Sequence, residues 1–316
     1  MAMPLVETKN LKKYFKTGAG MLHAVEDVNL KIMSGKTLGV VGESGCGKST
    51  LGRTILRLQP ATSGEVLYNG ENILKYKGKD MQKIHLNMQM VFQDPYSSLD
   101  PRMSVHNLIA EPVQVCGLLK TKAEINEHVR EIMDMCGLPA DQANLFPHEL
   151  DGGLRQRVGL ARAMAVSPKF IVCDEPVSAL DVSIQAQILN LLMDLQEQRE
   201  LSYMFITHDL CVVKHISDEI MVMYMGQVVE HAKTAELFAN PVHPYTKALL
   251  HAVPTIDLSK RNREGFMLRG EVTSPINPAP GCRFAPRCPY ATDKCKENVC
   301  LKEVSPDHFV ACSLCD

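Results

Sequence analysis

The segment GESGCGKST, Gly42 to Thr50, constrains the fold more than any other part of this 316-residue chain. It directly follows the apolar run TLGVV (37–41), precedes the helix-like run STLGRTILRL, and matches the pattern G-x-x-x-x-G-K-S/T in full. Glycines let backbone amides cradle phosphate oxygens, the Lys48 side chain reaches the β- and γ-phosphates, and the Ser49 hydroxyl can bind Mg²⁺. The segment therefore predicts a strand, a phosphate-binding loop and a helix. The candidate loop residues are Gly42, Ser44, Gly45, Cys46, Gly47, Lys48, Ser49 and Thr50.

Apolar runs that read as strands alternate with amphipathic helical patterns up to about residue 254. This alternation is expected of an α/β domain with a largely parallel core. One helix is predicted after the capping box of Thr121 and Glu124, ending at Gly137, and a second from about Asp181. The further strand candidates are KFIVC (169–173) and SYMFIT (202–207). Beyond residue 254, the segment TSPINPAPG carries three prolines and predicts an irregular extension.

The composition indicates an ordinary globular protein without a surface for nucleic acid. Hydrophobic residues make up 45% of the chain, and the formal net charge of −2 gives no reason to expect a nucleic-acid surface. The segment MAMPLVETKN lacks the pattern of a signal peptide, and no apolar run reaches the roughly 18 residues of a spanning helix. We therefore expect a cytosolic chain, which other subunits must hold in place if it works at a membrane.

An acidic pair, Asp174 and Glu175, follows the strand candidate 169–173. At the end of a strand, Asp174 can hold Mg²⁺, and Glu175 can orient or deprotonate a water molecule. Taken singly, such a pair is more often a solvated loop, and Gln93 in MVFQDP and His208 in FITHD are unremarkable. Their common order along the chain gives them weight.

Together these motifs resemble the ATP-binding cassette (ABC) family over about residues 5–255. In family order, the matching motifs are the Walker A motif (42–50), Q-loop (Gln93), signature (150–154), Walker B motif (170–174), catalytic glutamate (Glu175), D-loop (178–181) and switch histidine (His208). The resemblance implies an α/β fold with a RecA-like core, an antiparallel β subdomain and a helical subdomain at about 94–165. These parts form a nucleotide-binding domain over 1–254, followed by an irregular Cys-rich extension over 255–316.

The resemblance also implies how ATP is bound and used. In this family, two ATPase subunits hold each ATP between the Walker motifs of one subunit and the signature of the other. The implied catalytic residues are Glu175, His208 and Gln93, and the implied Mg²⁺ ligands are Ser49, Gln93 and Asp174. Phe15, or alternatively Tyr14, matches the aromatic residue that stacks on adenine. Region 93–150 is expected to pass motion to membrane subunits.

The signature departs from the family pattern. It usually reads Leu-Ser-Gly-Gly-Gln, whereas this chain reads Leu-Asp-Gly-Gly-Leu, so Asp151, Gly152 and Gly153 would face the ATP of a partner subunit. Asp and Ser are comparable N-caps, but a carboxylate about 4 Å from a phosphate charge costs about 4 kcal/mol at a dielectric of 20. We expect the site that borrows Asp151 to work poorly, which requires a non-identical partner. Alternatively, the turn shifts and tolerates both Asp151 and Leu154.

The chain has eleven cysteines in two groups. Five are scattered among apolar neighbours and are expected to be buried, inert thiols: Cys46, Cys116, Cys136, Cys173 and Cys211. The other six lie in the last 35 residues and suggest a ligand or bridge: Cys282, Cys288, Cys295, Cys300, Cys312 and Cys315. Structural disulfides are not expected in a cytosolic chain.

The C-terminal segments NPVHPYTKALLHAVP (240–254), GCRFAPRCPYATDKC and HFVAC resemble ATPase subunits of bacterial oligopeptide and dipeptide importers, a branch shared with nickel importers. Within that branch, Cys282, Cys288, Cys295 and Cys312 match cysteines that hold a [4Fe-4S] cluster. Their spacing is wider than that of zinc knuckles, yet four thiolates can bind either, so Zn²⁺ and free thiols remain alternatives. Cys300 or Cys315 could replace one of the four.

The sequence therefore predicts an ATP- and Mg²⁺-dependent ATPase subunit that energises peptide import from the cytoplasmic face of the inner membrane. The expected partners are two transmembrane permease subunits, a second, non-identical ABC ATPase subunit and, indirectly, an extracytoplasmic solute-binding protein; nucleic acid is not among them. The alternatives are an importer of nickel or another small solute, or a mainly regulatory subunit that binds ATP.

Overall fold

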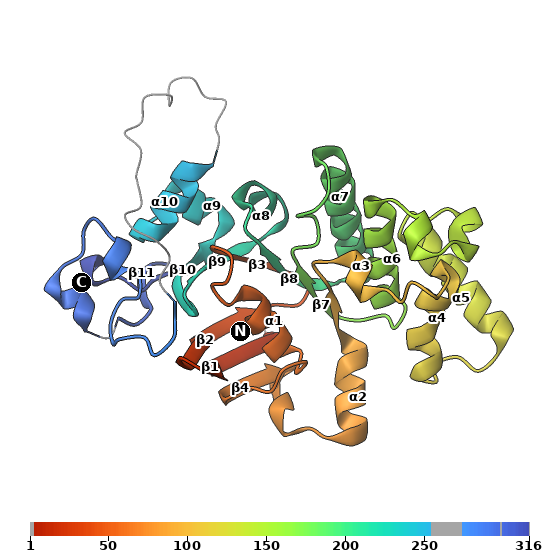
Figure 1. Ribbon diagram of the computed structural model, residues 1–316, viewed down its shortest axis with the longest axis horizontal. Coiled ribbons are helices and arrows are strands. Elements are labelled where there is room, and N and C mark those ends of the chain that lie inside the picture. Colours follow the sequence, from red (N-terminus) through yellow and green to blue (C-terminus); the bar gives the residue numbers. More distant parts are fainter. Residues whose placement is uncertain (1–2, 254–273, 298, 316) are drawn as a thin grey trace. The chain divides into compact units, whose positions relative to one another are not determined.

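The computed structural model describes residues 3–253, 274–297 and 299–315. The chain divides into two compact units (Figure 1). Unit 1 contains Met1–Met33, Thr37–Leu74 and Phe205–Asp316, and unit 2 contains Ser34–Lys36 and Lys75–Met204. Within the described ranges, no helix combines the length and apolarity needed to cross a membrane.

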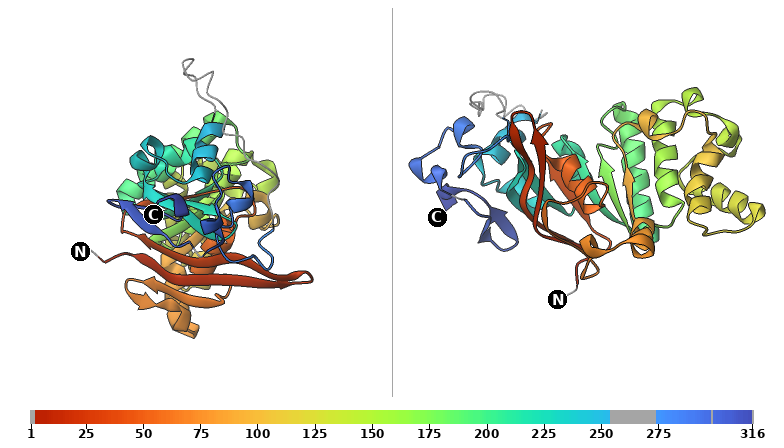
Figure 2. Two further views of the ribbon diagram at one scale, coloured as in Figure 1. Left: turned by 90° about the vertical axis from the view of Figure 1, so that its left-hand side faces the viewer. Right: turned by 60° about the horizontal axis from the view of Figure 1, so that its bottom comes forward.

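An antiparallel four-stranded sheet forms one part of unit 1, in the order β2-β1-β4-β5. Its long hairpin, drawn in red in Figure 2, pairs β1 (Val6–Thr17) with β2 (Gly20–Ile32). The shorter strands are β4 (Ser63–Tyr68) and β5 (Glu71–Asn72). One face of the hairpin is buried, through Leu11, Val25 and Val28 among others. This sheet agrees with the antiparallel β subdomain that the resemblance implies.

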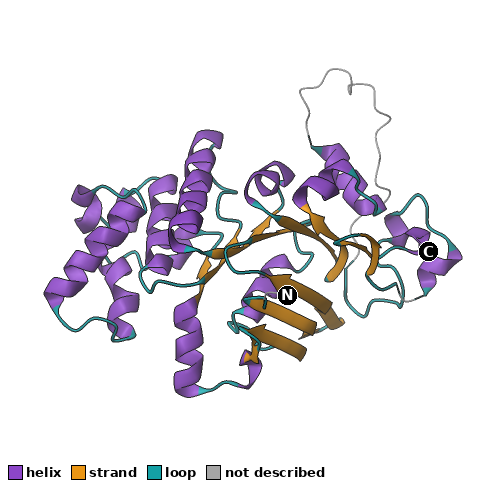
Figure 3. Ribbon diagram, turned by 180° about the vertical axis from the view of Figure 1, so that it is seen from behind, coloured by secondary structure: helices purple, strands orange, loops and turns teal. Residues whose placement is uncertain are grey.

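The rest of unit 1 is a mixed α/β layer (Figure 3). The fully buried β3 (Thr37–Val41) runs parallel to β9 (Glu219–Tyr224), which pairs antiparallel with β10 (Gln227–Lys233). The helices of this unit are α1 (Lys48–Ile55), α8 (Leu210–Ile216), α9 (Thr234–Ala239) and α10 (Pro244–Ala252). Strand β8 (Ser202–Thr207) contains residues of both units.

Unit 2 is mostly helical around two parallel strands, β6 (Met88–Val91) and β7 (Phe170–Asp174). Its helices are α2 (Gly78–Asn87), α3 (Pro95–Ser98), α4 (Val105–Val115), α5 (Lys122–Met135), α6 (Gly152–Met164) and α7 (Val182–Arg199). Helices α4, α5 and α6 pack on one another through buried side chains such as Leu108, Val129 and Val158. They lie within the range predicted for the helical subdomain.

The predicted elements that can be compared are present, with shifted boundaries at β7 and at α1, which ends at Ile55. The strands at 37–41 and 202–207 have the expected ends, whereas β7 begins one residue later than expected and includes Asp174. Helix α5 starts with the predicted capping box, because Thr121 Oγ1 accepts from the Glu124 N–H at 3.2 Å and Glu124 Oε2 from the Thr121 N–H at 3.0 Å. Asp181 caps α7 through the N–H groups of Ser183 and Ile184.

The described part of the extension has more order than the sequence predicts. Ile276 bridges to Leu22 on β2, as expected of a proline-rich segment that is not helical. Farther on, β11 (Lys302–Ser305) and β12 (His308–Val310) form a hairpin, and β12 pairs with β10. These strands are too short to show an alternating pattern. They are held by a buried contact of 2.8 Å between His308 Nε2 and Glu230 Oε1.

The expectation of buried thiols is right for three of the five scattered cysteines and wrong for two. Cys46, Cys136 and Cys173 are buried, and burial raises their pKa values, that of Cys136 to about 12. Cys116 and Cys211 are exposed. Cys116 is the C-cap of α4, next to the exposed Val115, and Cys211 lies in the first turn of α8, so their apolar sequence neighbours do not enclose them.

Candidate functional site

The phosphate-binding motif of unit 1 forms the loop between β3 and α1. Two glycines are required by close backbone approach. Gly42 has φ 154°, and a Cβ there would lie 2.2 Å from the Met223 carbonyl oxygen; Gly47 has φ 106°, and a Cβ there would lie 2.0 Å from that of Ala24. No L-residue with a side chain fits at either position without displacing β-strand backbone.

Lys48 begins helix α1, and its side chain folds back onto the loop. The residue is only 4% exposed, and its Nζ donates to the carbonyl oxygens of Gly42 at 2.8 Å and Glu43 at 3.0 Å. Ser49 and Thr50 follow it in the first turn of α1, which contains no acidic residue. A helix N-terminus, a glycine-rich loop and a buried ammonium group together favour the binding of a phosphate group.

The aromatic candidates near this loop have different surroundings. The Tyr14 hydroxyl donates to Glu26 Oε1 at 2.6 Å, and its ring stacks on His23 with centroids 4.0 Å apart. Phe15 is half-buried, and Lys13 Nζ lies 4.5 Å from its ring centroid. The assignment of Phe15 to adenine stacking remains a prediction.

Glu26 carries the most perturbed carboxyl group near this hairpin. Burial opposes its ionisation, but hydrogen bonds from Tyr14, His23 and Lys12 and the charge of Arg283 lower its pKa to about 2.

His208, the predicted switch residue, belongs to the same unit. It is exposed and lies between the end of β8 and Asp209, the N-cap of α8.

In unit 2, the structure brings two predicted catalytic residues together. Gln93 follows β6 and Glu175 follows β7, and the carboxyl ends of parallel strands meet at one edge of a sheet. Gln93 Nε2 donates to Glu175 Oε2 at 2.9 Å. Asp174, the last residue of β7, is fully buried next to them. An amide donor that fixes a carboxylate beside a second carboxylate is suited to orient water and a metal ion.

Glu175 also has a strained backbone. Its φ is 46°, in the left-handed region that costs a residue with a side chain about 1–2 kcal/mol. Nine other non-glycine residues of the described chain also have positive φ, among them Arg57 and Glu200, so this backbone alone does not mark Glu175 as functional. Its role is supported by its motif and by its hydrogen bond from Gln93.

The signature turn keeps its helix cap. Asp151 is the exposed N-cap of α6, and its Oδ1 accepts from the Leu154 N–H at 2.8 Å, so the expectation that Asp replaces Ser as a cap is confirmed. At Gly153, a Cβ would lie 2.6 Å from Ile184 Cγ2, and at Gly152 it would lie 3.2 Å from Leu180 Cδ2. The two glycines thus allow α6 to begin against the segment that leads into α7.

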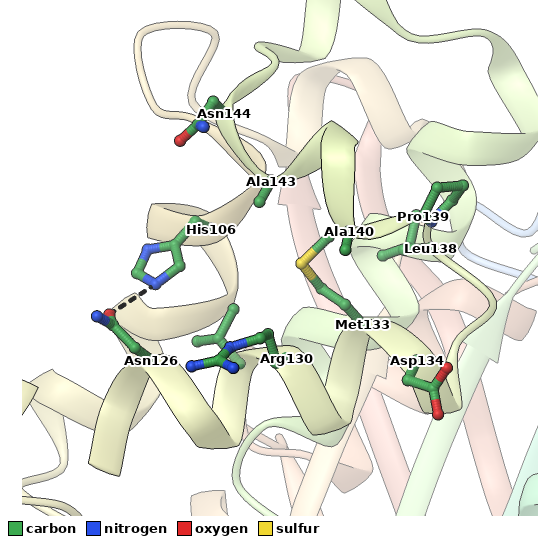
Figure 4. A pocket seen from close by; sticks show the side chains of 11 residues that line it. His106, Asn126, Arg130, Met133, Asp134, Leu138, Pro139, Ala140, Ala143 and Asn144 are labelled. Atoms are coloured by element: carbon green, nitrogen blue, oxygen red, sulfur yellow. Dashed lines mark hydrogen bonds between the residues drawn. The ribbon is translucent and has the colours of Figure 1, made fainter. Parts of the chain in front are cut away.

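A cavity of about 530 Å³ opens in the helical part of unit 2 (Figure 4). It is lined by His106 of α4, by Asn126, Arg130 and Met133 of α5, and by the turn after α5. His106 Nε2 and Asn126 Oδ1 are 3.0 Å apart. None of the predicted nucleotide-site residues lines this cavity.

The four cysteines predicted to hold a cluster lie in one region of the extension. Burial raises the pKa values of Cys282, Cys288 and Cys312, that of Cys282 to about 11, and neighbouring thiols of the same four raise them further. Cys295 differs, because hydrogen bonds from Ser313 and Thr292 outweigh burial and lower its pKa. Even so, the residues that the structure describes contain no group of His, Cys, Asp or Glu arranged to hold a metal ion.

Sequence reasoning missed three residues in this region, two of which contact the phosphate-binding loop. Arg287, in the extension, pairs with Glu43, and Tyr245 of α10 accepts from the Glu43 N–H. Arg283, in the same segment, pairs with Glu26. The sequence signal for the two arginines is their closeness in CRFAPRC. It does not predict their acidic partners, because those lie far away in the sequence.

Comparison with known proteins identifies the family of this chain. Residues 25–178 match the ABC transporter family, and residues 229–295 match the family described as oligopeptide/dipeptide transporter, C-terminal region. The chain is 49% identical to the oligopeptide transport ATP-binding protein OppF of Bacillus subtilis, over 99% of this chain and 97% of that protein. It is 47% identical to the oligopeptide transport ATP-binding protein AppF of the same species, over 98% of this chain and 97% of that protein.

Solved structures show the same fold. The chain is similar to CbiO1 from Clostridium perfringens, part of the ABC transporter complex CbiONQ, with a TM-score of 0.67 and 26% identity over 76% of this chain and 92% of that one. It is also similar to MJ0796, a bacterial ABC transporter cassette solved as a dimer, with a TM-score of 0.66 and 29% identity over 72% of this chain and 98% of that one.

Proposed function

This chain belongs to the ABC transporter family, as an ATP-binding subunit of its peptide importers, and we propose that its ATP hydrolysis energises the import of peptides. The observation that carries the proposal is the loop 42–50, in which the buried Lys48 is held at the start of α1. The choice of peptide as the solute is supported by 47–49% identity, over nearly the full length of the chain, to oligopeptide transport ATP-binding proteins. An importer of nickel or another small solute is the second candidate.

In the proposed reaction, Lys48 and the amides of loop 42–50 bind the phosphates of ATP, which fixes the γ-phosphate for attack. Mg²⁺ would be held by Ser49, Gln93 and Asp174, whose hydroxyl, amide and carboxylate oxygens are suitable ligands, and would neutralise phosphate charge. Glu175, oriented by the Gln93 amide, accepts a proton from the attacking water.

The remaining assigned residues complete the proposed site. His208 contacts the γ-phosphate, and Phe15 or Tyr14 stacks on adenine. The reaction needs no covalent intermediate, since positioned water and electrostatic stabilisation suffice. The division into a nucleotide-binding domain over 1–254 and an extension over 255–316 stays a prediction.

The proposed partners are two transmembrane permease subunits and a second, non-identical ABC ATPase, with this chain at the cytoplasmic face of the membrane. Relatives named as peptide import and oligopeptide transport ATP-binding proteins support the permeases. The carboxylate of Asp151 supports a non-identical ATPase, because a homodimer would place that charge in both ATP sites.

The test of the proposed function is peptide uptake into vesicles that contain the assembled transporter. Native complex is expected to take up labelled peptide only when ATP is supplied, and a complex with Glu175→Gln is expected to bind ATP but lose most uptake and turnover. Uptake that continues at the native rate with Glu175→Gln would contradict the proposal. Uptake of nickel in place of peptide would support the second candidate.

A docking role for the helical part of unit 2 forms part of the same proposal. The cavity lined by His106, Asn126 and Arg130 lies within the region that the resemblance links to the membrane subunits (Figure 4). Arg130→Glu reverses a charge at its rim and is expected to weaken co-purification of the permeases without changing ATP binding. Equal co-purification would place the contact elsewhere.

We also propose a [4Fe-4S] cluster on Cys282, Cys288, Cys295 and Cys312, with Zn²⁺ as the second candidate. The match of these four positions to the cluster-binding cysteines of the importer branch supports the choice, although the described residues are not arranged as a metal site. No step of the reaction above depends on it. Anaerobic reconstitution, with iron and sulfide counted for the native chain and Cys288→Ser, tests the proposal; a native chain without iron would refute it.

A further inference from the structure

The Cys-rich extension contacts the phosphate-binding loop through one buried arginine. Arg287 lies in a short 3-10 turn, Ala285–Arg287, and is 7% exposed. Its Nη1 donates to both carboxylate oxygens of Glu43, at 2.8 Å to Oε2 and 3.1 Å to Oε1. Glu43 is the only acidic residue of loop 42–50, so this pair neutralises the one negative side chain of the loop.

Glu43 is held by three different contacts. Its carboxylate accepts from Arg287, its N–H donates to the Tyr245 hydroxyl at 2.9 Å, and its carbonyl oxygen accepts from Lys48 Nζ at 3.0 Å. A displacement of Glu43 therefore moves a backbone carbonyl that binds the phosphate-binding lysine. Arg287 is thus one residue removed from Lys48, although 239 positions separate them in the sequence.

A layer of buried aromatic rings fixes Arg287 in place. The guanidinium carbon lies 5.8 Å from the ring centroid of Tyr224, and Tyr224 makes edge contacts with Tyr245 at 4.8 Å and Phe284 at 5.3 Å. The three rings are at most 1% exposed. Because Phe284 belongs to the extension and Tyr245 to α10, the segment around Arg287 is part of the core of unit 1 rather than a loose tail.

A second arginine of the same segment contacts the β1–β2 hairpin. Arg283 Nη2 donates to Glu26 Oε2 at 3.0 Å, and its Nη1 donates to the carbonyl oxygens of Met225 and His23. Glu26 also accepts from Tyr14, one of the two candidates for adenine stacking. The extension therefore reaches both parts of unit 1 that the proposed function assigns to the nucleotide.

We propose that the extension is a positioning element for ATP binding, with Arg287 holding Glu43 and neutralising its charge beside the phosphate-binding loop. This inference rests on the proposed binding of ATP. Without Arg287, the Glu43 carboxylate faces the phosphates unpaired, and the loop carbonyl that binds Lys48 loses an anchor. The nucleotide affinity of this chain then depends on residues far outside the 25–178 match to the ABC transporter family.

The experiment measures the Kd of a fluorescent ATP analogue for the full-length chain, and the KM and kcat for ATP of the assembled complex. We expect Arg287→Ala to raise Kd and KM roughly tenfold with little change in kcat, because a partly buried charge pair is broken away from the reacting atoms. Arg287→Lys keeps the charge and is expected to recover part of the affinity.

The substitution Glu43→Gln distinguishes a loss of affinity caused by the unpaired charge from a loss caused by defective folding. If the unpaired carboxylate causes the loss, adding Glu43→Gln to Arg287→Ala restores part of the affinity, whereas a general folding defect would deepen with the second change. Lys296→Ala is the matched control, because it breaks an exposed ion pair with Asp293 in the same extension and is expected to leave Kd unchanged. Thermal unfolding of each variant is recorded alongside.

The outcomes separate this inference from the function on which it rests. If the native chain does not bind ATP, the proposed function fails. If the native chain binds ATP and Arg287→Ala binds it with the same Kd, the inference alone is overturned. A rise in Kd with Arg287→Ala that Glu43→Gln deepens, together with a lower unfolding temperature, also overturns it, because a structural role would then suffice.

Discussion

The carboxylate of Asp151 gives the sharpest prediction about the proposed asymmetry. It is exposed at the start of α6, and its Oδ1 is anchored by the Leu154 N–H at 2.8 Å, so the charge is fixed where a partner's phosphate would bind. About 4 kcal/mol of repulsion, for charges about 4 Å apart at a dielectric of 20, exceeds the roughly 1 kcal/mol returned by the helix terminus. The net cost of about 3 kcal/mol corresponds to about a hundredfold lower ATP turnover at that site.

The assay isolates the affected site by disabling the other one. In a complex that carries Glu175→Gln, the remaining ATP turnover comes from the site that borrows Asp151 and takes its catalytic residues from the second ATPase. We expect this turnover to be low, and we expect Asp151→Ser in the same background to raise it, by up to about a hundredfold. The cap is kept, because Ser is a comparable N-cap, so the unfolding temperature should change little.

Asp151→Asn is the matched control for shape. It removes the charge, keeps the size and still caps α6, so it should raise turnover as Ser does if charge is the cause. Turnover that is unchanged by both substitutions in the Glu175→Gln background would refute the electrostatic reasoning. Near-native turnover with Glu175→Gln alone would show instead that the working site is not the one built on this chain.

Three further predictions concern unit 1. Gly47→Ala should abolish ATP binding and destabilise the chain by more than about 1 kcal/mol, because φ is 106° and backbone occupies the Cβ position; Gly18→Ala, with no atom within 4 Å of its Cβ, is the control. Glu26 should add stability above about pH 4.5 that is lost as pH falls toward its pKa of about 2, so Glu26→Gln should flatten an acid-unfolding curve over that range. His308→Ala should cost about 1–3 kcal/mol in urea unfolding, because the fully buried Glu230 loses one hydrogen-bond partner and keeps the N–H groups of Val242 and His243.

Local patterns in the sequence predict the local structure well. Strand β3 and the capping box of α5 depend on neighbours in the chain, and both are as predicted. The Gln93–Glu175 hydrogen bond was within reach of the same reasoning, since both residues follow strands that a parallel sheet aligns.

Contacts between distant segments account for what the sequence could not show. Arg287 and Glu43 are 244 positions apart, and no local periodicity relates them. The hairpin of β11 and β12 is held by a contact with the buried Glu230 of β10. The residue pattern within 302–310 does not predict that contact. Cys211 was expected to be buried because its sequence neighbours are apolar. In the fold, those neighbours are buried in the core while Cys211 is exposed to solvent.

The left-handed backbone at Glu175 sets stability against activity at a single position. Glycine would adopt φ 46° without the penalty of about 1–2 kcal/mol, so Glu175→Gly should raise the unfolding temperature of the chain while removing the proposed base. A screen that selects variants for heat resistance alone would therefore enrich transporters that no longer work. Thermostable variants of this subunit should be sought elsewhere in the chain, with position 175 held fixed.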